Sequence, residues 1–143
     1  HHNAEALAKL MAENCQELLS RVLVVDFNLK NHARIRAAGM RVRYGDISNP
    51  ETLRHCGLDK AKVVVLTLSS TFLKGTSGQK ILNVVLSINP DIRFIGTAST
   101  ARHVDDLIGK GACACISPEQ EAAPAYLQAI QSALMAKPSV RAA

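Results

Sequence analysis

Val22-Leu-Val-Val-Asp26 and, further along the chain, Arg43-Tyr-Gly-Asp46 are the stretches that decide the fold. Each reads as the end of a buried strand that closes on a carboxylate. In open α/β sheets, ligands bind in the crevice outside the carboxyl ends of the strands. Two neighbouring parallel strands that both stop on Asp are therefore expected to place their acids on a ligand rather than in solvent.

Asp26 is the first candidate for a binding residue. An acid that closes the second strand of a dinucleotide-binding fold accepts hydrogen bonds from the ribose hydroxyls. The alternative is structural, because an Asp at this position also suits the N-cap of a helix that begins near Asn28. The residues themselves leave both interpretations open.

Helices and strands alternate along the rest of the chain. Apolar residues spaced three to four apart predict an amphipathic first helix. Asn49-Pro50 opens a later helix, and Gly39 and Gly57 suit left-handed helix ends. Residues 62–68 form a continuous run rich in Val, which predicts a parallel strand buried on both faces. The predicted helices cover residues 3–19, 29–38, 50–56, 79–88, 100–110 and 117 onward, and the predicted strands cover residues 22–25, 40–44, 62–68, 92–98 and 113–116.

This alternation predicts an α/β domain with a Rossmann-like, doubly wound parallel sheet and helices on both faces. Such a fold opens with a strand and a Gly-rich turn, whereas this sequence enters its first helix directly after His1-His2, which is either the end of an affinity tag or native. In the strand order 3-2-1-4-5-6 the first strand is central. Without it, strands two and four are expected to have unpaired edges around an open core. We therefore expect that the sequence is a fragment, or that the first strand was removed or is donated by another chain.

The composition is that of one soluble globular domain. A chain of 143 residues buries about two thirds of its unfolded surface and leaves no room for a second core. Apolar residues make up 48% and charged residues 20%. No apolar run reaches the roughly 20 residues of a membrane crossing, and no signal peptide is recognisable. The net charge of +5 is scattered, with few aromatic residues, which argues against nucleic-acid binding. The charge indicates mainly a solvated surface, which is also able to attract a phosphate-bearing ligand.

The cysteines indicate a reducing compartment. Cys15, Cys56, Cys113 and Cys115 show neither C-x-x-C spacing nor the density of a disulfide scaffold, so the cytoplasm is the expected location. Cys113 and Cys115 share one face of a short strand, which with His55 beside Cys56 allows a zinc site as one interpretation. Small buried thiols are the favoured one.

A series of further segments follows these elements in a fixed order. They are Gly39-Met-Arg-Val-Arg-Tyr-Gly-Asp46, Asn49-Pro-Glu-Thr-Leu-Arg-His-Cys-Gly57, Lys60-Ala-Lys-Val-Val-Val-Leu66, Ile88-Asn-Pro-Asp-Ile-Arg-Phe-Ile95, the helix with His103, Gly111-Ala112 and Ile116-Ser-Pro-Glu119. Together with Asp26 the series resembles the N-terminal, nucleotide-binding lobe of the RCK or TrkA-N family, the regulatory module of potassium channels, Trk-type uptake systems and Kef-type antiporters. The resemblance runs from about Leu7 to Glu121 and depends on the order of the segments, since no single one is specific.

The resemblance implies a nucleotide site at the carboxyl edge of the sheet. In the family, the acid matching Asp26 holds the adenosine ribose, the residues matching Tyr44, Gly45 and Asp46 line the adenine end, and the end of the fourth strand closes the pocket. The implied ligand is NAD(H) or an adenine nucleotide such as AMP or ATP. Asp26 would repel a 2′-phosphate, which favours NAD over NADP. The predicted binding set is Asp26, Phe27, Asn28, Tyr44, Gly45, Asp46, Ile47, Thr67, Leu68, Ser69 and Thr97, with no catalytic residue and no metal ligand.

The chain departs from the family pattern where phosphate should bind. The family's G-x-G-x-x-G falls at or before Ala4, so its backbone donors are truncated or replaced by residues 1–3. Thr97 stands where many members have Arg, and Ser69-Ser70 where many have two Asp. The loop of residues 74–78, Lys-Gly-Thr-Ser-Gly, is either a compensating anion site before a helix or a surface loop.

The function implied by the resemblance is a cytosolic regulatory domain that binds NAD(H) or an adenine nucleotide and controls potassium or cation transport by a membrane channel or antiporter, at the cytosolic face of the inner membrane. Residues 1–121 form the nucleotide-binding lobe, and residues 122–143 form a C-terminal helix and tail. A homodimer or higher gating-ring oligomer is expected, with apolar late helices as the surface for a twofold partner. Two alternatives stay open: a degenerate lobe that dimerises without nucleotide, and a nicotinamide-dependent oxidoreductase, which would need a proton-transfer residue.

Overall fold

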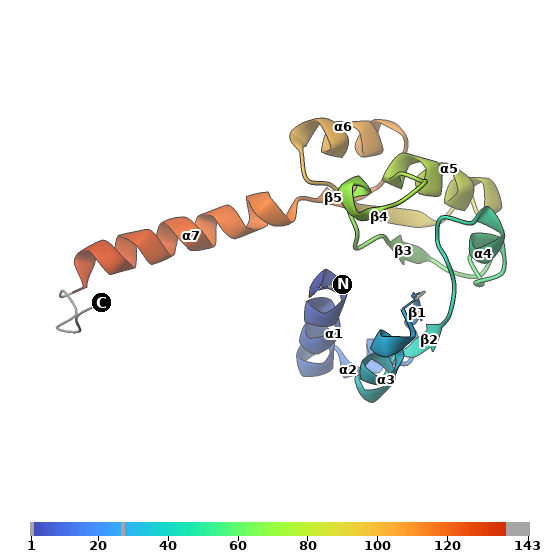
Figure 1. Ribbon diagram of the computed structural model, residues 1–143, viewed down its shortest axis with the longest axis horizontal. Coiled ribbons are helices and arrows are strands. Elements are labelled where there is room, and N and C mark those ends of the chain that lie inside the picture. Colours follow the sequence, from blue (N-terminus) through green and yellow to red (C-terminus); the bar gives the residue numbers. More distant parts are fainter. Residues whose placement is uncertain (1, 27, 137–143) are drawn as a thin grey trace.

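Helices and strands alternate in the order predicted from the sequence (Figure 1). The computed structural model describes residues 2–26 and 28–136. The predicted first helix is two helices, because the chain breaks at Cys15. The elements are α1 (His2–Asn14), α2 (Gln16–Leu19), β1 (Leu23–Val25), α3 (Leu29–Ala37), β2 (Arg41–Arg43), α4 (Pro50–Arg54), β3 (Val63–Val65), the 3₁₀ turn η1 (Ser70–Phe72), α5 (Gly78–Ile88), β4 (Arg93–Thr97), α6 (Ala101–Gly109), β5 (Ala114–Ile116) and α7 (Pro118–Met135).

Side-chain caps and glycines set the helix ends. The side chains of Asn28 and Asn49 accept hydrogen bonds from backbone N–H groups in the first turns of α3 and α4, which satisfies donors that have no partner within the helix. Gly39 and Gly57 have φ values of +94° and +85°, where a side chain is strained. The predicted glycine stops are therefore confirmed.

The parallel strands form two sheets rather than one. β1 pairs with β2, and β3, β4 and β5 form a second sheet in that order. The two sheets separate between β1 and β3. In the general strand order 3-2-1-4-5-6, this is the position of the central strand that comes first in the chain. The unpaired edges expected from the sequence are thus present on β1 and β3 among the described residues.

The main core lies on one face of the three-stranded sheet. Phe94 on β4 and Leu82 and Val85 on α5 are fully buried there, and α6 contributes Leu107. A smaller cluster of Ala8, Leu19 and Met40 joins α1 and α2 to the two-stranded sheet. The two halves therefore have separate cores of unequal size.

The other face of the three-stranded sheet is open, which corrects one prediction. Residues 62–68 were predicted to be buried on both faces, but Val63 and Val65 are 50% and 45% exposed. Only the face with Val64 packs against the main core. A continuous apolar run shows that a strand has two apolar faces, whereas covering both faces depends on other elements of the fold.

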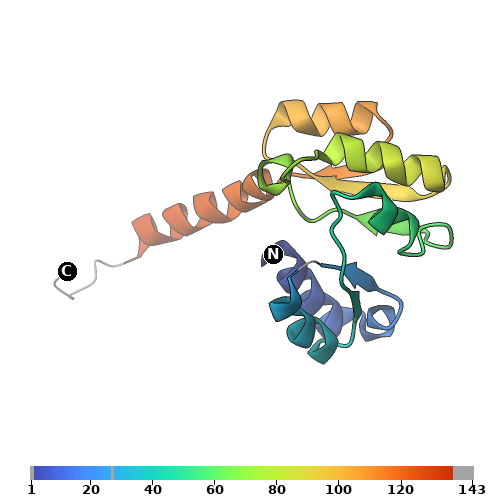
Figure 2. The ribbon, with the colours of Figure 1, turned by 45° about the vertical axis from the view of Figure 1, so that its right-hand side comes forward.

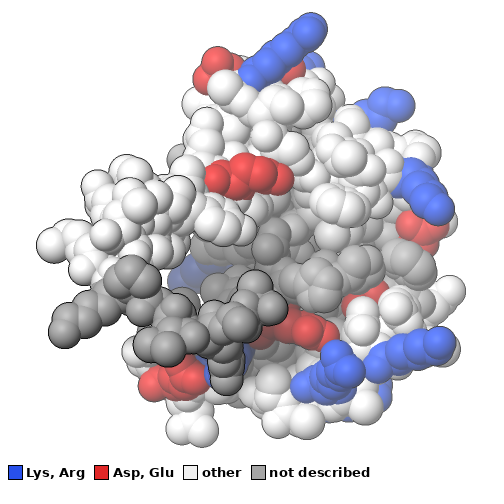
Figure 3. All heavy atoms as spheres, turned by 60° about the vertical axis from the view of Figure 1, so that its left-hand side comes forward, with Lys and Arg blue, Asp and Glu red and all other residues white. Residues whose placement is uncertain are grey.

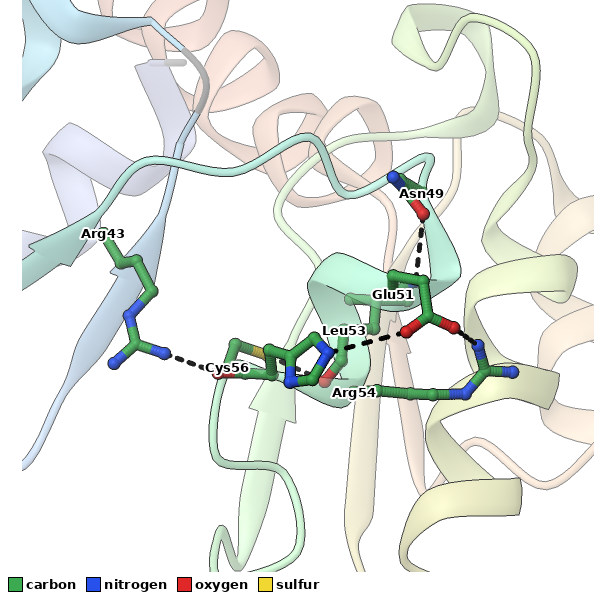
Figure 4. Close-up of polar contacts among 7 residues, drawn as sticks. Arg43, Asn49, Glu51, Leu53, Arg54 and Cys56 are labelled. Carbon is green, nitrogen blue, oxygen red and sulfur yellow. Dashed lines mark hydrogen bonds and ion pairs between the residues drawn. The ribbon is translucent and has the colours of Figure 1, made fainter.

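The segment between the two sheets ties the halves together (Figure 4). Arg43, at the end of β2, donates a hydrogen bond to the carbonyl oxygen of His55, just after α4. Glu51 of α4 forms ion pairs with Arg54 and, at 3.5 Å, with His55. Val25 of β1 also packs against the main core.

Helix α7 projects away from the rest of the molecule (Figures 1 and 2). None of its residues is buried. It begins at Pro118, so the predicted boundary between residues 121 and 122 lies inside one continuous helix. Residues 137–143 of the predicted tail are outside the described part. In that part no helix has the length and apolar character needed to cross a membrane.

Candidate nucleotide-binding site

A large cavity opens at the carboxyl ends of β1, β2 and β3, between the two sheets. Its volume is about 1040 Å³, at the upper end of the roughly 300–1,000 Å³ typical of small-molecule sites. We call it the carboxyl-edge cavity. Residues from α1, α3 and the segment around η1 complete its wall: Ala4, Glu5, Ala8, Lys9, Val24, Val25, Asp26, Asn31, Arg34, Ile35, Ala38, Met40, Tyr44, Gly45, Asp46, Ile47, Ser48, Thr67, Leu68, Thr71, Phe72, Leu73, Lys74 and Thr76.

Most of the predicted binding residues line this cavity. They are Asp26, Tyr44, Gly45, Asp46, Ile47, Thr67 and Leu68. Phe27 lies outside the described residues, and Asn28, Ser69 and Thr97 are not part of the cavity wall. The two strand-end acids therefore share one cavity, as the pattern of strands ending in Asp indicated.

Asp26 is held in place from two sides. The backbone N–H of Asn28 and the side-chain amide of Asn31 each donate a hydrogen bond of 2.8 Å to a different carboxylate oxygen of Asp26. The N-cap of α3 is Asn28 rather than Asp26. Each carboxylate oxygen has two lone pairs, so one on each remains for a ligand hydroxyl. The alternative of Asp26 as the helix cap is thus not what the structure shows.

His32 supports the turn that follows β1 and contains Asp26. It is buried on α3, and its Nε2 lies 2.9 Å from the backbone carbonyl oxygen of Asp26. Because a carbonyl only accepts, Nε2 carries the proton and donates it. His32 was not predicted, since a His in a helix gives no sequence signal that it faces the preceding strand end.

Asp46 is exposed and is braced by the residue two positions later. The backbone N–H and the hydroxyl of Ser48 donate hydrogen bonds of 2.9 and 2.7 Å to Oδ1 of Asp46. These bonds stabilise the ionised form and lower the pKa of Asp46 below its usual value. Asp46 therefore stays an acceptor at neutral pH.

Two of the predicted residues outside the cavity wall, Ser69 and Thr97, form hydrogen bonds near the ends of β3 and β4. The hydroxyl of Thr97 donates a 2.7 Å hydrogen bond to the backbone carbonyl of Leu66, and both Thr97 and Ser69 are buried. The hydroxyl of Ser99 lies 3.1 Å from that of Ser69. These contacts hold the segment that carries Thr67 and Leu68.

Charged residues of α1 and α3 line the cavity without having been predicted. Glu5 and Arg34 form an ion pair of 3.2 Å across the two helices, and Lys9 lies on the same wall. In the sequence they look like ordinary solvent-facing helix charges. Only the packing of α1 against α3 shows that they face a cavity.

The loop of residues 74–78 borders the cavity. Two backbone N–H groups in the first turn of α5, which follows the loop, already donate hydrogen bonds within the chain. Lys74 and Thr76 line the cavity. Ser77 caps α5 by accepting from Lys80 N–H, and Gly78 N–H donates to the Ser70 hydroxyl. The loop therefore offers the cavity a Lys side chain and a Thr rather than a set of free helix amides.

The four cysteines of the described residues are free thiols. No cluster of His, Cys, Asp and Glu there is suited to a metal ion, and burial raises the pKa of Cys56 and Cys115. Cys113, in contrast, is exposed. Positive and negative side chains are interspersed on the face in Figure 3, without a continuous basic stripe.

Comparison with known proteins shows the family to which the chain belongs. A family model described as the TrkA-N domain matches residues 3–118. The chain belongs to the TrkA-N family. The match covers most of the described domain and confirms the resemblance drawn from the sequence.

Two solved structures show the fold of this TrkA-N domain. The TrkA-N domain of the Escherichia coli inner membrane protein ybaL has a TM-score of 0.68 at 23% identity, over 85% of this chain and 87% of that one. The NAD(P)-binding domain of an exopolyphosphatase-related protein from Archaeoglobus fulgidus has a TM-score of 0.66 at 18% identity, over 89% of this chain and 92% of that one. The Rossmann-like α/β class is thereby confirmed.

A curated relative is closer in sequence but much longer. A glutathione-regulated potassium-efflux system protein of Haemophilus influenzae is 42% identical over 60 residues, which are 40% of this chain and 10% of that protein. The matched region is thus a tenth of the relative's length.

Proposed function

We propose that this TrkA-N domain binds NAD(H) or an adenine nucleotide in the carboxyl-edge cavity and so regulates potassium or cation transport by a membrane channel or antiporter. The observation that carries the proposal is the convergence of Asp26 and Asp46, from the ends of two paired parallel strands, on one cavity of about 1040 Å³. In open α/β sheets this edge is where nucleotides bind.

The residues present suit the ribose and the base. Asp26 has acceptor capacity left on both carboxylate oxygens after its hydrogen bonds to the chain, which matches two ribose hydroxyls. Tyr44, Ile47 and Leu68 provide apolar surface on the same wall for an adenine ring. A 2′-phosphate would meet the Asp26 carboxylate, so we propose NAD(H) over NADP(H).

Positive side chains of the described residues are available to the phosphates. Lys9 and Lys74 both line the cavity. A Lys binds phosphate as a point charge without the directional contacts of a backbone loop. We therefore propose that the contribution of these two lysines to phosphate binding weakens as the salt concentration rises.

The proposed role in transport is based on the family match and on a relative that is a transport protein. The family match and the relative that is a potassium-efflux system protein support a membrane transporter as partner, on the cytoplasmic side. In this role nucleotide binding shifts the balance between two states of a dimer or gating ring, so no chemical step is required.

The two alternative functions would require different features of the molecule. A degenerate lobe would keep the fold and the dimer and bind no nucleotide. An oxidoreductase would need a proton donor beside the nicotinamide, and Tyr44, a cavity residue, is followed four positions later by Ser48 rather than by a Lys. We therefore rank both below the regulatory role.

Calorimetric and thermal-shift titrations with NADH, NAD, NADP, AMP and ATP test the proposal. At about 100 times Kd, a ligand adds about 2.7 kcal/mol to the free energy of unfolding, so the wild-type Tm should rise by several degrees. Asp26→Asn should abolish that rise, whereas Asp59→Asn, the same change away from the cavity, should keep it.

The outcomes separate the three functions. If no nucleotide raises the Tm of a folded, dimeric wild-type chain, the degenerate lobe is correct. Turnover of NADH with any oxidised substrate would instead establish an oxidoreductase. Equal affinity for NADP and NAD would contradict the role assigned to Asp26.

A further inference from the structure

Two exposed aromatic side chains line the carboxyl-edge cavity, one from each half of the molecule. Among the described residues of the wall they are Tyr44, just after β2, and Phe72, the last residue of η1. Their exposed fractions are 63% and 69%. Small-molecule sites are lined mainly by apolar and aromatic side chains, and planar rings stack on an aromatic face. Tyr44 belongs to the adenine end of the proposed site, which leaves Phe72 without an assigned ligand contact.

The residues around Phe72 are anchored, whereas its own ring is not. Ser69 is buried, and its carbonyl oxygen accepts a 3.0 Å hydrogen bond from the Phe72 N–H. The Ser70 hydroxyl accepts a 3.1 Å hydrogen bond from the Gly78 N–H, which ties η1 to the start of α5. Leu73 packs against the main core. The neighbours therefore fix the turn, and the exposed Phe72 ring adds little to the packing of the chain itself.

The surroundings of Phe72 distinguish it from a single apolar residue on an open surface, which is common in proteins. Lys74, a proposed phosphate contact, follows Phe72 by two residues and lines the same cavity. A dinucleotide bound with its first ribose at Asp26 and its phosphates at Lys74 would carry its second nucleoside on toward η1. We therefore expect the second ring of such a ligand to meet Phe72.

The size of the cavity agrees with a ligand that has two ring systems. Its volume of about 1040 Å³ is at the upper end of the range for small-molecule sites. AMP and ATP each have one ring system, so either would leave Tyr44 or Phe72 facing water. A dinucleotide has a ring system at each end and would cover both.

We propose that Phe72 is the stacking surface for the nicotinamide ring, so that the carboxyl-edge cavity selects the dinucleotide NAD(H) over a mononucleotide. The inference rests on the proposed function and specifies the class of ligand within it. Stacking removes one face of Phe72 and one face of the ligand ring from water together. Because η1 is already ordered, little conformational freedom is lost when the ligand binds.

Calorimetric titration of the full chain with NADH, ADP-ribose and AMP tests the proposal. ADP-ribose is the matched ligand, because it keeps the adenosine, both phosphates and the second ribose and lacks only the nicotinamide ring. The wild type should bind NADH at least about fivefold more tightly than ADP-ribose, the lower end of what stacking one base on an aromatic side chain contributes. Phe72→Ala should weaken NADH binding by that factor and leave the affinities for ADP-ribose and AMP unchanged.

Two control variants separate stacking from a general effect on the fold. Phe72→Tyr keeps an aromatic face and should keep the wild-type affinity for NADH. Ile108→Ala shortens an exposed apolar side chain on α6, outside the cavity wall, and should bind all three ligands as the wild type does. Since Phe72 is mostly exposed, thermal unfolding of Phe72→Ala without ligand should match that of the wild type.

The alternative outcomes are distinct. A wild type that binds NADH and ADP-ribose equally, or a Phe72→Ala variant that keeps full NADH affinity, would overturn the inference alone. Equal losses of AMP and NADH affinity in Phe72→Ala would also overturn it, because Phe72 would then contact the adenine ring. A folded wild type that binds none of the three ligands would contradict the proposed function as well as the inference.

Discussion

The Asp26 carboxylate is fixed before a ligand arrives. The Asn28 backbone N–H and the Asn31 amide hold it at 2.8 Å each, and His32 supports the same turn through the Asp26 carbonyl oxygen. A side chain that is already ordered loses less conformational freedom on binding. The structural bonds and the proposed ligand contact therefore use different lone pairs of one residue and do not compete.

Ser48 controls the ionisation of Asp46. Ser48→Ala removes the hydroxyl that donates to Asp46 and leaves the backbone N–H in place. We expect the pKa of Asp46 to rise toward the usual value of an aspartate, which carbon-detected NMR titration of the carboxyl group measures.

The sign of the effect on stability follows from linkage. Because the folded-state pKa of Asp46 is lowered, its contribution is present above the unfolded pKa and is lost as the pH falls through the folded pKa. Ser48→Ala should therefore lower stability slightly at pH 7 and not at all below both pKa values. An unchanged Asp46 pKa in the variant would contradict this account.

Individual site residues were predictable where strand order alone places them. Asp26, Asp46, Thr67 and Leu68 follow strands whose carboxyl ends meet at one sheet edge, so their meeting required no knowledge of packing. The charged residues of α1 and α3 were not predictable in this way. Their direction depends on how the two helices pack, which periodicity does not specify.

At the scale of elements, Gly45 allows the exit of β2 to pass close to α4. A Cβ on Gly45 would lie 2.6 Å from Thr52 Cγ2 and 3.0 Å from Val25 Cγ1. Thr52 is β-branched and stiff within its helix. Overpacking of this kind typically costs about 1–3 kcal/mol, and we expect Gly45→Ala to lower the free energy of unfolding by that amount in urea denaturation.

A second substitution checks the cause. Thr52→Ser removes Cγ2, so Gly45→Ala/Thr52→Ser should recover part of the lost stability, a coupling that a double-mutant cycle measures. Gly109→Ala is the control, because a Cβ there meets nothing within 4 Å. Additive effects of the two changes would show that the clash with Thr52 is not the reason.

Helix ends were predictable and strand burial was not. Asn28, Asn49 and Gly57 act through bonds and dihedral angles within a few residues, so local sequence suffices. The break at Cys15 has no glycine or proline to signal it. The exposure of Val63 and Val65 depends on elements remote in sequence, and no local pattern contains that information.

At the scale of the molecule, the two halves should differ in stability. The three-stranded sheet has a large core with fully buried Phe94, Leu82 and Val85, whereas the two-stranded sheet rests on Ala8, Leu19 and Met40. Regions with fewer buried apolar contacts open at lower free energy.

Native-state hydrogen exchange measures this difference. The amides of Asp26 and Arg41, bonded to Arg43 and Val22, should exchange roughly tenfold or more faster than those of Ala98 and Cys113. A nucleotide in the carboxyl-edge cavity contacts both halves, so it should slow Asp26 and Arg41 most. Equal protection of both sheets without ligand would show one cooperative unit instead.

The α/β class and the order of elements were predictable because alternation alone determines them. The unpaired edges of β1 and β3 were expected from the order of the strands, but the division into two sheets, the size of the cavity and the direction of α7 were not. These depend on how long-range contacts and a one-residue link position whole elements.

The edges of β1 and β3 that are unpaired in the described residues also bear on how this part of the chain, taken by itself, behaves at high concentration. An unpaired strand edge can form hydrogen bonds with an extended segment of another chain, and such pairing is a first step toward amyloid-like aggregation. Here each edge strand has only three residues, and short edges give an incoming chain few hydrogen bonds. Brevity thus serves as protection against precipitation, and substitutions that lengthen either strand would weaken it.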